Sequence, residues 1–323
     1  MQALLAQAPA RTEFLLVDDA STESLDALRP LLDRDNVFLI SHPDNQGVAA
    51  ARNSALHWCR HRGHELVIMI DSDCLPGPDF ISTHLDMHRE SPGVACIGGA
   101  VVGRGSSAWA RLDGIMSWVH AAPHYPRHTV ETPYHLPTTN FSVKLALLPN
   151  RPFVFDERLR TGEDCLLIRE LRHNGQRAEF SPSPVIYHRD RERLWDVVRH
   201  HYAWGHHQYF IQLGGDLSPR VFNPLYRLAF FVVFFWLWPL YSLAGAVLNL
   251  VPWLSRRARN IFWMPAVYAL WLCKGAAVLE AAVRPRAVLR AARAEVTYNP
   301  VLSTTPAAVA EGAPLAGRAG AAP

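Results

Sequence analysis

The chain has 323 residues, 49% hydrophobic and 19% charged, which provides enough apolar material for a sizeable core and excludes a disordered protein. Its formal net charge of +3 argues against a protein that binds nucleic acid through overall charge. The five cysteines are odd in number and form no C-x-x-C pair, so we expect neither a disulfide scaffold nor a zinc site, and a reducing compartment fits.

The first two hundred residues alternate between strand-like and helix-like patterns. Residues 1–13 lack both a basic region and a long apolar run, so we expect no signal peptide. The predicted elements are a buried strand at 14–17, a helix at 24–32, a strand at 37–40, an Ala-rich helix at 48–61 and a buried strand at 66–70. This alternation predicts an α/β layer with a largely parallel sheet, which binds ligands at the carboxyl ends of its strands.

Two apolar stretches follow the mixed region that runs from about 75 to 220. Residues 228–254 carry no charge and are long enough to cross a bilayer, although Pro239 would kink the helix or divide it into a re-entrant pair. Residues 261–283 are interrupted by Lys274 and Glu280. The stretch 299–323 is rich in Ala, Pro and Gly, and we expect it to be disordered.

Basic clusters follow both apolar stretches. They consist of Arg256, Arg257 and Arg259 after the first, and Arg284, Arg286, Arg290 and Arg293 after the second. If both stretches span, one cluster lies outside, against the positive-inside tendency. A re-entrant or interfacial arrangement of one stretch avoids this conflict, and a buried pair of core helices is the alternative.

Asp71-Ser72-Asp73 follows the strand at 66–70 directly. Two carboxylates one residue apart at such a turn can face one cation, and hard oxygen ligands suit Mg²⁺ or Mn²⁺. Such an ion can bridge the phosphates of a nucleoside diphosphate. A D-x-D motif alone also occurs in solvated turns.

The D-x-D motif belongs to an ordered set. The other members are Asp18-Asp19, Asn45-Gln46-Gly47 before a helix carrying Arg52, Thr138-Thr139-Asn140, and Gly162-Glu163-Asp164. In this order and at these separations the chain resembles the family 2 glycosyltransferases over residues 14–190. The resemblance implies an α/β GT-A fold with a mixed, mostly parallel sheet, here followed by C-terminal membrane helices.

The resemblance also implies roles for single residues. Contacts to the donor nucleotide are implied for Asp18, Asp19, Asn45, Gly47, Arg52 and Asp71. Metal ligands would be Asp73, Asp71 and His188, holding Mn²⁺ or Mg²⁺. Asp164 resembles the catalytic base, with Glu163 orienting it or touching the acceptor. Thr139, Asn140 and Trp204 would line the acceptor or sugar pocket.

These roles predict an inverting transfer. A sugar hydroxyl is a poor nucleophile near neutral pH, so a carboxylate within reach takes its proton during attack opposite the leaving phosphate. Other interpretations remain open. Glu163 and Asp164 also suit a helix N-terminus, and His188 suits a surface or hydrogen-bonding position. Arg52 suits a simple ion pair, and Trp204, within residues 199–207, suits a helix at a membrane interface.

The sequence departs from the family pattern at its start. Similar enzymes begin with an apolar strand and a Pro-containing loop, whereas here only the end of the following helix precedes residue 14. We favour a start codon assigned too late over a fragment or a substitute segment. Lys144 stands where similar enzymes often carry Arg.

The predicted organisation is a catalytic domain at 1–220, a membrane-associated helical region at 221–298 and a tail at 299–323. Expected partners are a nucleotide-sugar donor, a lipid or glycan acceptor and a membrane, with no nucleic acid. Since nucleotide sugars are cytosolic, the catalytic domain should face the cytoplasm. The alternatives are a non-catalytic or truncated binding protein, and a nucleotidyltransferase, although no Gly-rich basic phosphate loop is visible.

Overall fold

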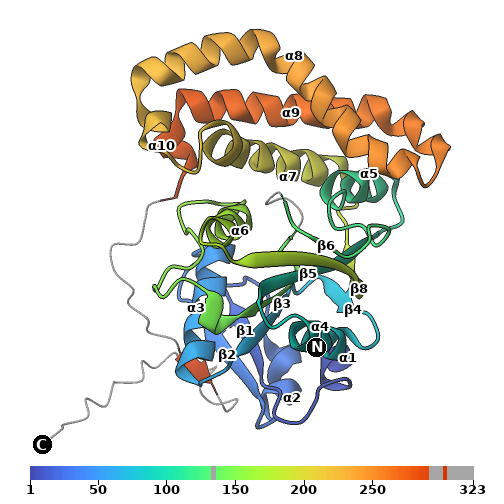
Figure 1. The fold of residues 1–323 in the computed structure, drawn as a ribbon, viewed down its shortest axis with the longest axis vertical. Coiled ribbons are helices and arrows are strands. Elements are labelled where there is room, and N and C mark those ends of the chain that lie inside the picture. Colours follow the sequence, from blue (N-terminus) through green and yellow to red (C-terminus); the bar gives the residue numbers. More distant parts are fainter. Residues whose placement is uncertain (132–135, 291–300, 304–323) are drawn as a thin grey trace, which may run out of the picture.

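The computed structural model describes residues 1–131, 136–290 and 301–303. Figure 1 shows an α/β body with a layer of long helices across one side of it. The helices of the body are α1 (Gln2–Leu5), α2 (Arg29–Leu32), α3 (Val48–His61), α4 (Phe80–Glu90), α5 (Ala108–Ser117) and α6 (Glu163–His173), with short 3₁₀ turns η1 (Asp26–Leu28) and η3 (Leu145–Leu147).

The strands form two sheets. In the smaller sheet, β1 (Phe14–Asp18) pairs in parallel with β2 (Val37–Ser41), and β9 (Val301–Ser303) pairs antiparallel with β2. The larger sheet has the order β3 (Leu66–Ile70), β7 (Asn140–Lys144), β5 (Val94–Arg104), β8 (Arg177–Arg189), β4 (Cys74–Pro76), and β6 (His128–Thr129) also pairs with β8.

The expectation of a mixed sheet is confirmed, but its parallel share is smaller than we expected. Among the described strands only β1–β2 and β5–β8 are parallel, while β3–β7, β5–β7, β4–β8 and β6–β8 are antiparallel. The regular strand–helix alternation that predicted parallel pairing ends near residue 70, and the later strands are not linked by such crossovers.

Most elements predicted for the first seventy residues are confirmed, in β1, β2, β3 and α3, whereas the helix predicted at 24–32 is the 3₁₀ turn η1 followed by the short helix α2. Helix α3 starts after Gly47, whose φ of 92° lies in the left-handed region that glycine adopts without strain. Its buried face includes Ala49, Ala50 and Asn53. The Asn53 amide donates to the Phe155 carbonyl and accepts from the Phe155 amide, at 2.9 and 2.8 Å, which fixes the segment before α6.

Strands β1 and β3 each pair on one edge only within the described part of the chain, and no described strand joins the two sheets. Their side chains are mostly half-buried, whereas residues 37–40 of β2 are fully buried. The prediction that β1 and β3 are buried strands was therefore wrong for all their residues except Phe14 and Met69.

The helical layer contains α7 (Leu194–His207), the π-helix η4 (Gln208–Leu213), η5 (Pro219–Phe222), α8 (Pro224–Leu254), η6 (Ala258–Trp263), α9 (Met264–Val283) and α10 (Pro285–Val288). Helix α9 lies between α7 and α8 (Figure 1). Helix α8 continues through Pro239, so the chain is not divided there.

Two segments, Pro224–Leu254 and Ala258–Val283, are long and apolar enough to cross a membrane, which is weak evidence of membrane association. The expectation of disorder at 299–323 lies outside the described residues, apart from 301–303 in β9.

Candidate active site

Arg52 joins two motifs that lie far apart in the sequence. From helix α3, its Nη1 contacts Glu163 Oε1, and its Nη2 lies 3.4 Å from Asp71 Oδ1. The guanidinium is 12% exposed and Glu163 only 4%, while Asp71 is 40% exposed. Burial lowers the pKa of Arg52, but Glu163, Asp71 and Asp164 outweigh it and raise the pKa above its ordinary value. The guanidinium therefore remains charged and holds the D-x-D and G-E-D segments together.

Glu163 and Asp164 occupy the first turn of α6 and differ in environment. Gly162 precedes them with φ of 86°, and a Cβ there would lie 2.9 Å from the ring of His207. Glu163 is buried, and its Oε2 has no hydrogen-bond partner among the described residues. Burial raises the pKa of Glu163, while Arg52 opposes this rise. Asp164 is half-buried, and its Oδ1 accepts from the Cys165 amide at 2.8 Å. Asp164 thus remains accessible to a reacting group.

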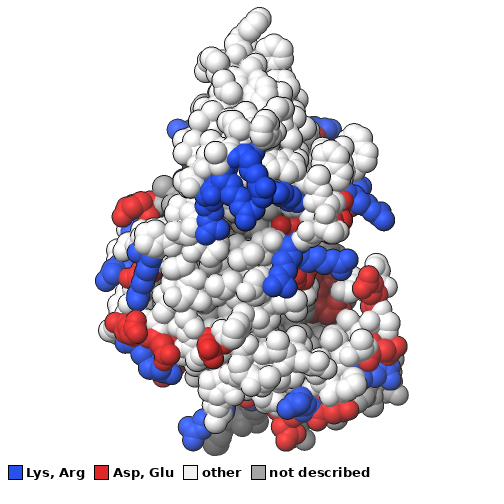
Figure 2. All heavy atoms as spheres, turned by 90° about the vertical axis from the view of Figure 1, so that its right-hand side faces the viewer, with Lys and Arg blue, Asp and Glu red and all other residues white. Residues whose placement is uncertain are grey.

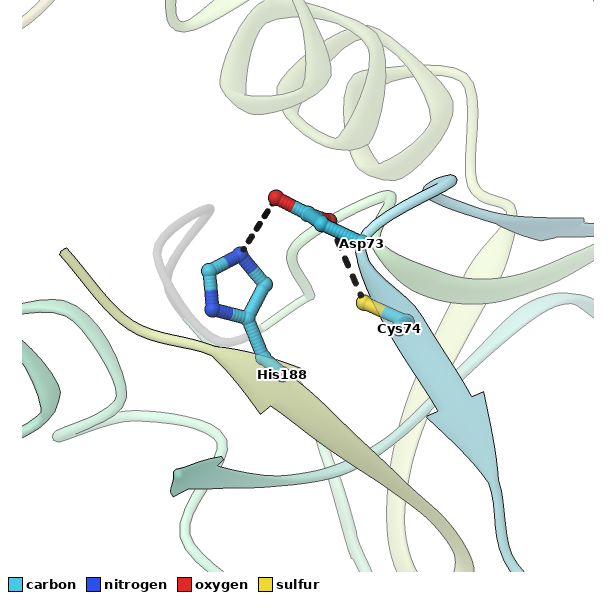
Figure 3. Close-up of side chains that lie close together, drawn as sticks. All are labelled: Asp73, Cys74 and His188. Atoms are coloured by element: carbon cyan, nitrogen blue, oxygen red, sulfur yellow. Dashed lines mark hydrogen bonds and ion pairs between the residues drawn. The ribbon is translucent and has the colours of Figure 1, made fainter. Parts of the chain in front are cut away.

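Asp73 and His188 meet between the turn after β3 and the end of β8. His188 Nε2 lies 3.3 Å from Asp73 Oδ2, and Figure 3 shows the imidazole pointing at this carboxylate. Together with Cys74, they are a group whose ligand atoms all lie within 4.8 Å of one another. Carboxylate oxygen and imidazole nitrogen fit Mn²⁺ or Mg²⁺. Burial raises the pKa of the Cys74 thiol, which stays protonated and is a poor ligand for such an ion.

Asp190 supports His188 from behind and was missed in the sequence. Its Oδ1 lies 3.0 Å from His188 Nδ1 and accepts from Trp118 Nε1 at 2.9 Å. The Asp190 carboxylate occupies space left by Gly103 and Gly114, because a Cβ at either position would lie 1.9 or 2.6 Å from Oδ2. A carboxylate behind a metal-ligating histidine fixes its ring orientation. The spacing of two residues after His188 was the available signal.

Of the other predicted metal ligands, Asp71 is directed elsewhere. Its Oδ2 accepts from the Thr139 hydroxyl, and its Oδ1 faces Arg52. Thr139 is buried beside this carboxylate. The structure therefore brings Asp71, Thr139, Arg52 and Glu163 into one hydrogen-bonded cluster.

The contacts that the described residues make with Asn140 do not support its predicted place in a pocket. Its side chain is fully buried, and its amide donates to the carbonyls of Ala100 and Pro184 at 2.9 and 2.8 Å. Its Oδ1 lies 3.0 Å from His84 Nε2. These contacts fasten β7 to β5, its neighbour, and to β8 on the far side of β5.

Asp19 closes the loop before α3. Its carboxylate accepts from the amides of Gln46 and Gly47 at 2.9 and 2.6 Å, and it lies 2.7 Å from His42 Nδ1. Burial alone would raise the pKa of Asp19, but these hydrogen bonds lower it. Asn45 donates to the Asp19 carbonyl at 3.1 Å. Asp18 caps the turn at the Ser21 amide at 3.0 Å. These residues form a second polar cluster, and none of the hydrogen bonds described here joins it to Asp73 or Asp164.

Trp204 lies in α7 and faces α9. Its ring centroid is 4.4 Å from that of His200 and 5.3 Å from Lys274 Nζ. Nearby, His207 Nδ1 lies 3.2 Å from the Thr161 hydroxyl, directly before the G-E-D segment. Helix α7 therefore adjoins the candidate site through His207 rather than through Trp204.

Comparisons with known proteins agree with the family resemblance. The model of "Glycosyl transferase family 2" matches residues 1–146. A pre-mycofactocin glycosyltransferase of Mycobacterium tuberculosis is 28% identical over 193 residues, covering 57% of this chain and 39% of the relative. A glucosyl-dolichyl phosphate glucuronosyltransferase of Haloferax volcanii is 31% identical over 108 residues, covering 32% of each protein.

Among solved structures, S. aureus TarS 1–349 aligns with a TM-score of 0.45 and 16% identity, covering 88% of this chain and 87% of that one. The chain spans less than two thirds of the length of the curated relatives described above. The family match together with the mixed α/β sheet confirms the GT-A fold class. The chain therefore contains a glycosyltransferase family 2 domain.

Proposed function

We propose that this protein is an inverting glycosyltransferase that moves a sugar from a nucleotide-diphosphate sugar to a lipid or glycan acceptor. The observation that carries the proposal is the Arg52 bridge, because it gathers Asp71 and Glu163 from distant motifs around one charged group. Buried charges are costly, so two carboxylates from distant motifs on one mostly buried guanidinium mark a candidate functional site.

The donor diphosphate would lie beside Asp73 and His188. A divalent cation held by these two residues would supply positive charge to the leaving phosphate. Asp190 keeps the His188 ring in position, so that Nε2 faces Asp73. Asp19 holds the loop that begins α3, which gives it a positioning role toward the nucleotide.

Asp164 would take the proton of the acceptor hydroxyl. It is half-buried, so it can meet both substrate and solvent, whereas Glu163 is committed to Arg52. Attack opposite the phosphate inverts the anomeric configuration and needs no covalent intermediate. The acceptor would approach near a membrane surface, with the body on the cytoplasmic side where nucleotide sugars occur.

Replacing the proposed base tests the mechanism. Asp164→Asn keeps the side-chain shape and removes the basic oxygen, so kcat for sugar transfer should fall by roughly 10²- to 10⁴-fold. Binding of the nucleoside diphosphate should stay within about twofold of the unsubstituted protein. Arg89→Met, an exposed change on α4, is the matched control. Normal transfer by Asp164→Asn would show that another group is the base.

The products that the unsubstituted protein releases separate the alternative hypotheses. A non-catalytic binding protein would bind a nucleotide sugar but release no nucleoside diphosphate with or without Mn²⁺. A nucleotidyltransferase would release pyrophosphate from a nucleoside triphosphate and sugar phosphate instead.

A further inference from the structure

The hairpin formed by α8, η6 and α9 is attached to the catalytic body at its closed end. Trp253 Nε1 donates to the Ile115 carbonyl at 3.0 Å, and Asn249 Nδ2 donates to the Met116 carbonyl at 3.2 Å. Both carbonyls belong to α5 of the body. Apolar side chains of α5, α7, α8 and α9 complete this contact in one buried cluster.

The open end of the hairpin is attached to the body as well. Val278 and Leu279 of α9 are buried in one cluster with Cys165 of α6 and with η4. In addition, Tyr202 and His206 of α7 lie 2.7 and 2.8 Å from Glu280 Oε2. The hairpin therefore contacts the body near both ends, directly and through α7.

A hairpin that spans a bilayer can touch its catalytic domain at one end only, because about 30 Å of hydrocarbon separates the other end from that side. Helix α8 alone has 31 residues, roughly 46 Å at 1.5 Å per residue. Figure 1 shows α8 and α9 extending across the body beside α7. From this attachment we infer that the hairpin lies flat in one leaflet of a bilayer and does not span it.

The outward side of α8 is the surface that would enter the lipid. Its exposed side chains include Leu228 (63%), Val233 (58%), Trp236 (76%), Leu240 (64%) and Leu248 (73%). Residues 228–254 carry no charge, and one continuous apolar surface of this length exceeds what a monomeric soluble protein exposes. The face is therefore built for an apolar environment.

Basic side chains at both ends of the hairpin identify that environment as lipid with anionic headgroups. Arg256, Arg257 and Arg259 are exposed at the closed end, and Arg220, Arg284 and Arg286 at the open end. Figure 2 shows an uncharged upper part of the molecule above a band of basic side chains. A flat hairpin puts both ends at headgroup depth on one side, which removes the conflict that two spanning helices create with the positive-inside tendency.

A second copy of the chain is a poorer occupant of this face. Pairing two copies through α8, in either direction, would bring a basic end of one hairpin against a basic end of the other. Like charges across an interface disfavour association, whereas anionic headgroups complement both ends at once. A lipid surface can bury the apolar face of α8 and pair its anionic headgroups with the arginines at both ends of the hairpin.

Labelling from one side of a membrane tests the flat arrangement. The protein is reconstituted in sealed vesicles of phosphatidylcholine and phosphatidylglycerol, with protease access to the body reporting its side. The variants are Pro224→Cys, at the first residue of α8, and Ala258→Cys, at the first residue of η6 just beyond the end of α8. Both positions are exposed. Both should react with an impermeant maleimide from the side of the body, above the background of the unsubstituted protein. If one reacts only after permeabilisation, α8 spans and the inference is wrong.

A charge on the outward face tests the lipid contact. Leu240→Glu should lower flotation with these vesicles at least tenfold, whereas Leu75→Glu, at a similarly exposed leucine in β4, should leave it unchanged. A lipid-free dimer that Leu240→Glu dissociates, with flotation unchanged, would favour a second copy and overturn the inference. Neither measurement depends on sugar transfer, so the proposed activity can fail independently.

Discussion

Replacing Arg52 by methionine should destabilise the protein strongly, because it leaves the buried Glu163 carboxylate without its cation. Glu163 is 4% exposed and its second oxygen already has no partner, whereas Asp71 is 40% exposed and can be solvated. Most of the cost therefore comes from Glu163, and removing one partner of a buried pair costs about 3–5 kcal/mol. For a domain of this size that corresponds to a decrease in Tm of roughly 6–20 °C.

The double variant Arg52→Met/Glu163→Gln distinguishes charge from packing. A neutral amide at 163 removes the buried charge, so the double variant should be more stable than Arg52→Met alone. Thermal unfolding followed by tryptophan fluorescence gives both values. Arg89→Met, which loses only an exposed pair with Asp86, should change stability by less than about 1 kcal/mol. A double variant no more stable than Arg52→Met would refute the electrostatic explanation.

Two further predictions concern buried histidine and the candidate metal site. Burial lowers the pKa of His84 to about 4. The stability that depends on neutral His84 is therefore complete above pH 6.5 and is lost as the pH falls toward 4. The loss is about 2 kcal/mol at pH 5. Chemical denaturation should show that the free energy of unfolding of His84→Gln falls by about 2 kcal/mol less than that of the unsubstituted protein between pH 7 and pH 5. An unchanged pH dependence of the free energy of unfolding would contradict this prediction. Asp73→Asn should abolish Mn²⁺ binding measured by electron paramagnetic resonance, and Asp190→Asn should weaken it about 10- to 100-fold. Cys74→Ser should bind normally, because its thiol is protonated; equal losses in all three variants would refute the ligand set.

Much of the fold near the N-terminus was predictable, because strand and helix signals there are local. The apolar runs at 14–17, 37–40 and 66–70 each correspond to a strand, and the Ala-rich run at 48–61 corresponds to α3. Pairing partners are not local. Strand β7 separates β3 from β5, and no pattern within these segments encodes that order.

The candidate site was predictable as a set of motifs but not as a geometry. Arg52 and Glu163 are 111 residues apart, so their pairing depends on the packing of α3 against α6. Asn140 was assigned to a pocket because it stands within a polar motif. A polar side chain is equally needed where three strands meet and backbone carbonyls require a donor.

Two consecutive residues of helix α7 contact different parts of the protein. His206 contacts Glu280 of the α8–α9 hairpin, while His207 adjoins Thr161 directly before the G-E-D segment. A detergent that loosens α9 would thus release α7 and misplace Glu163 and Asp164 without unfolding the sheets. The measured rate of turnover should therefore depend on the solubilising agent. Loss of turnover in a harsh detergent would indicate that Glu163 and Asp164 are displaced, and not that the protein is denatured.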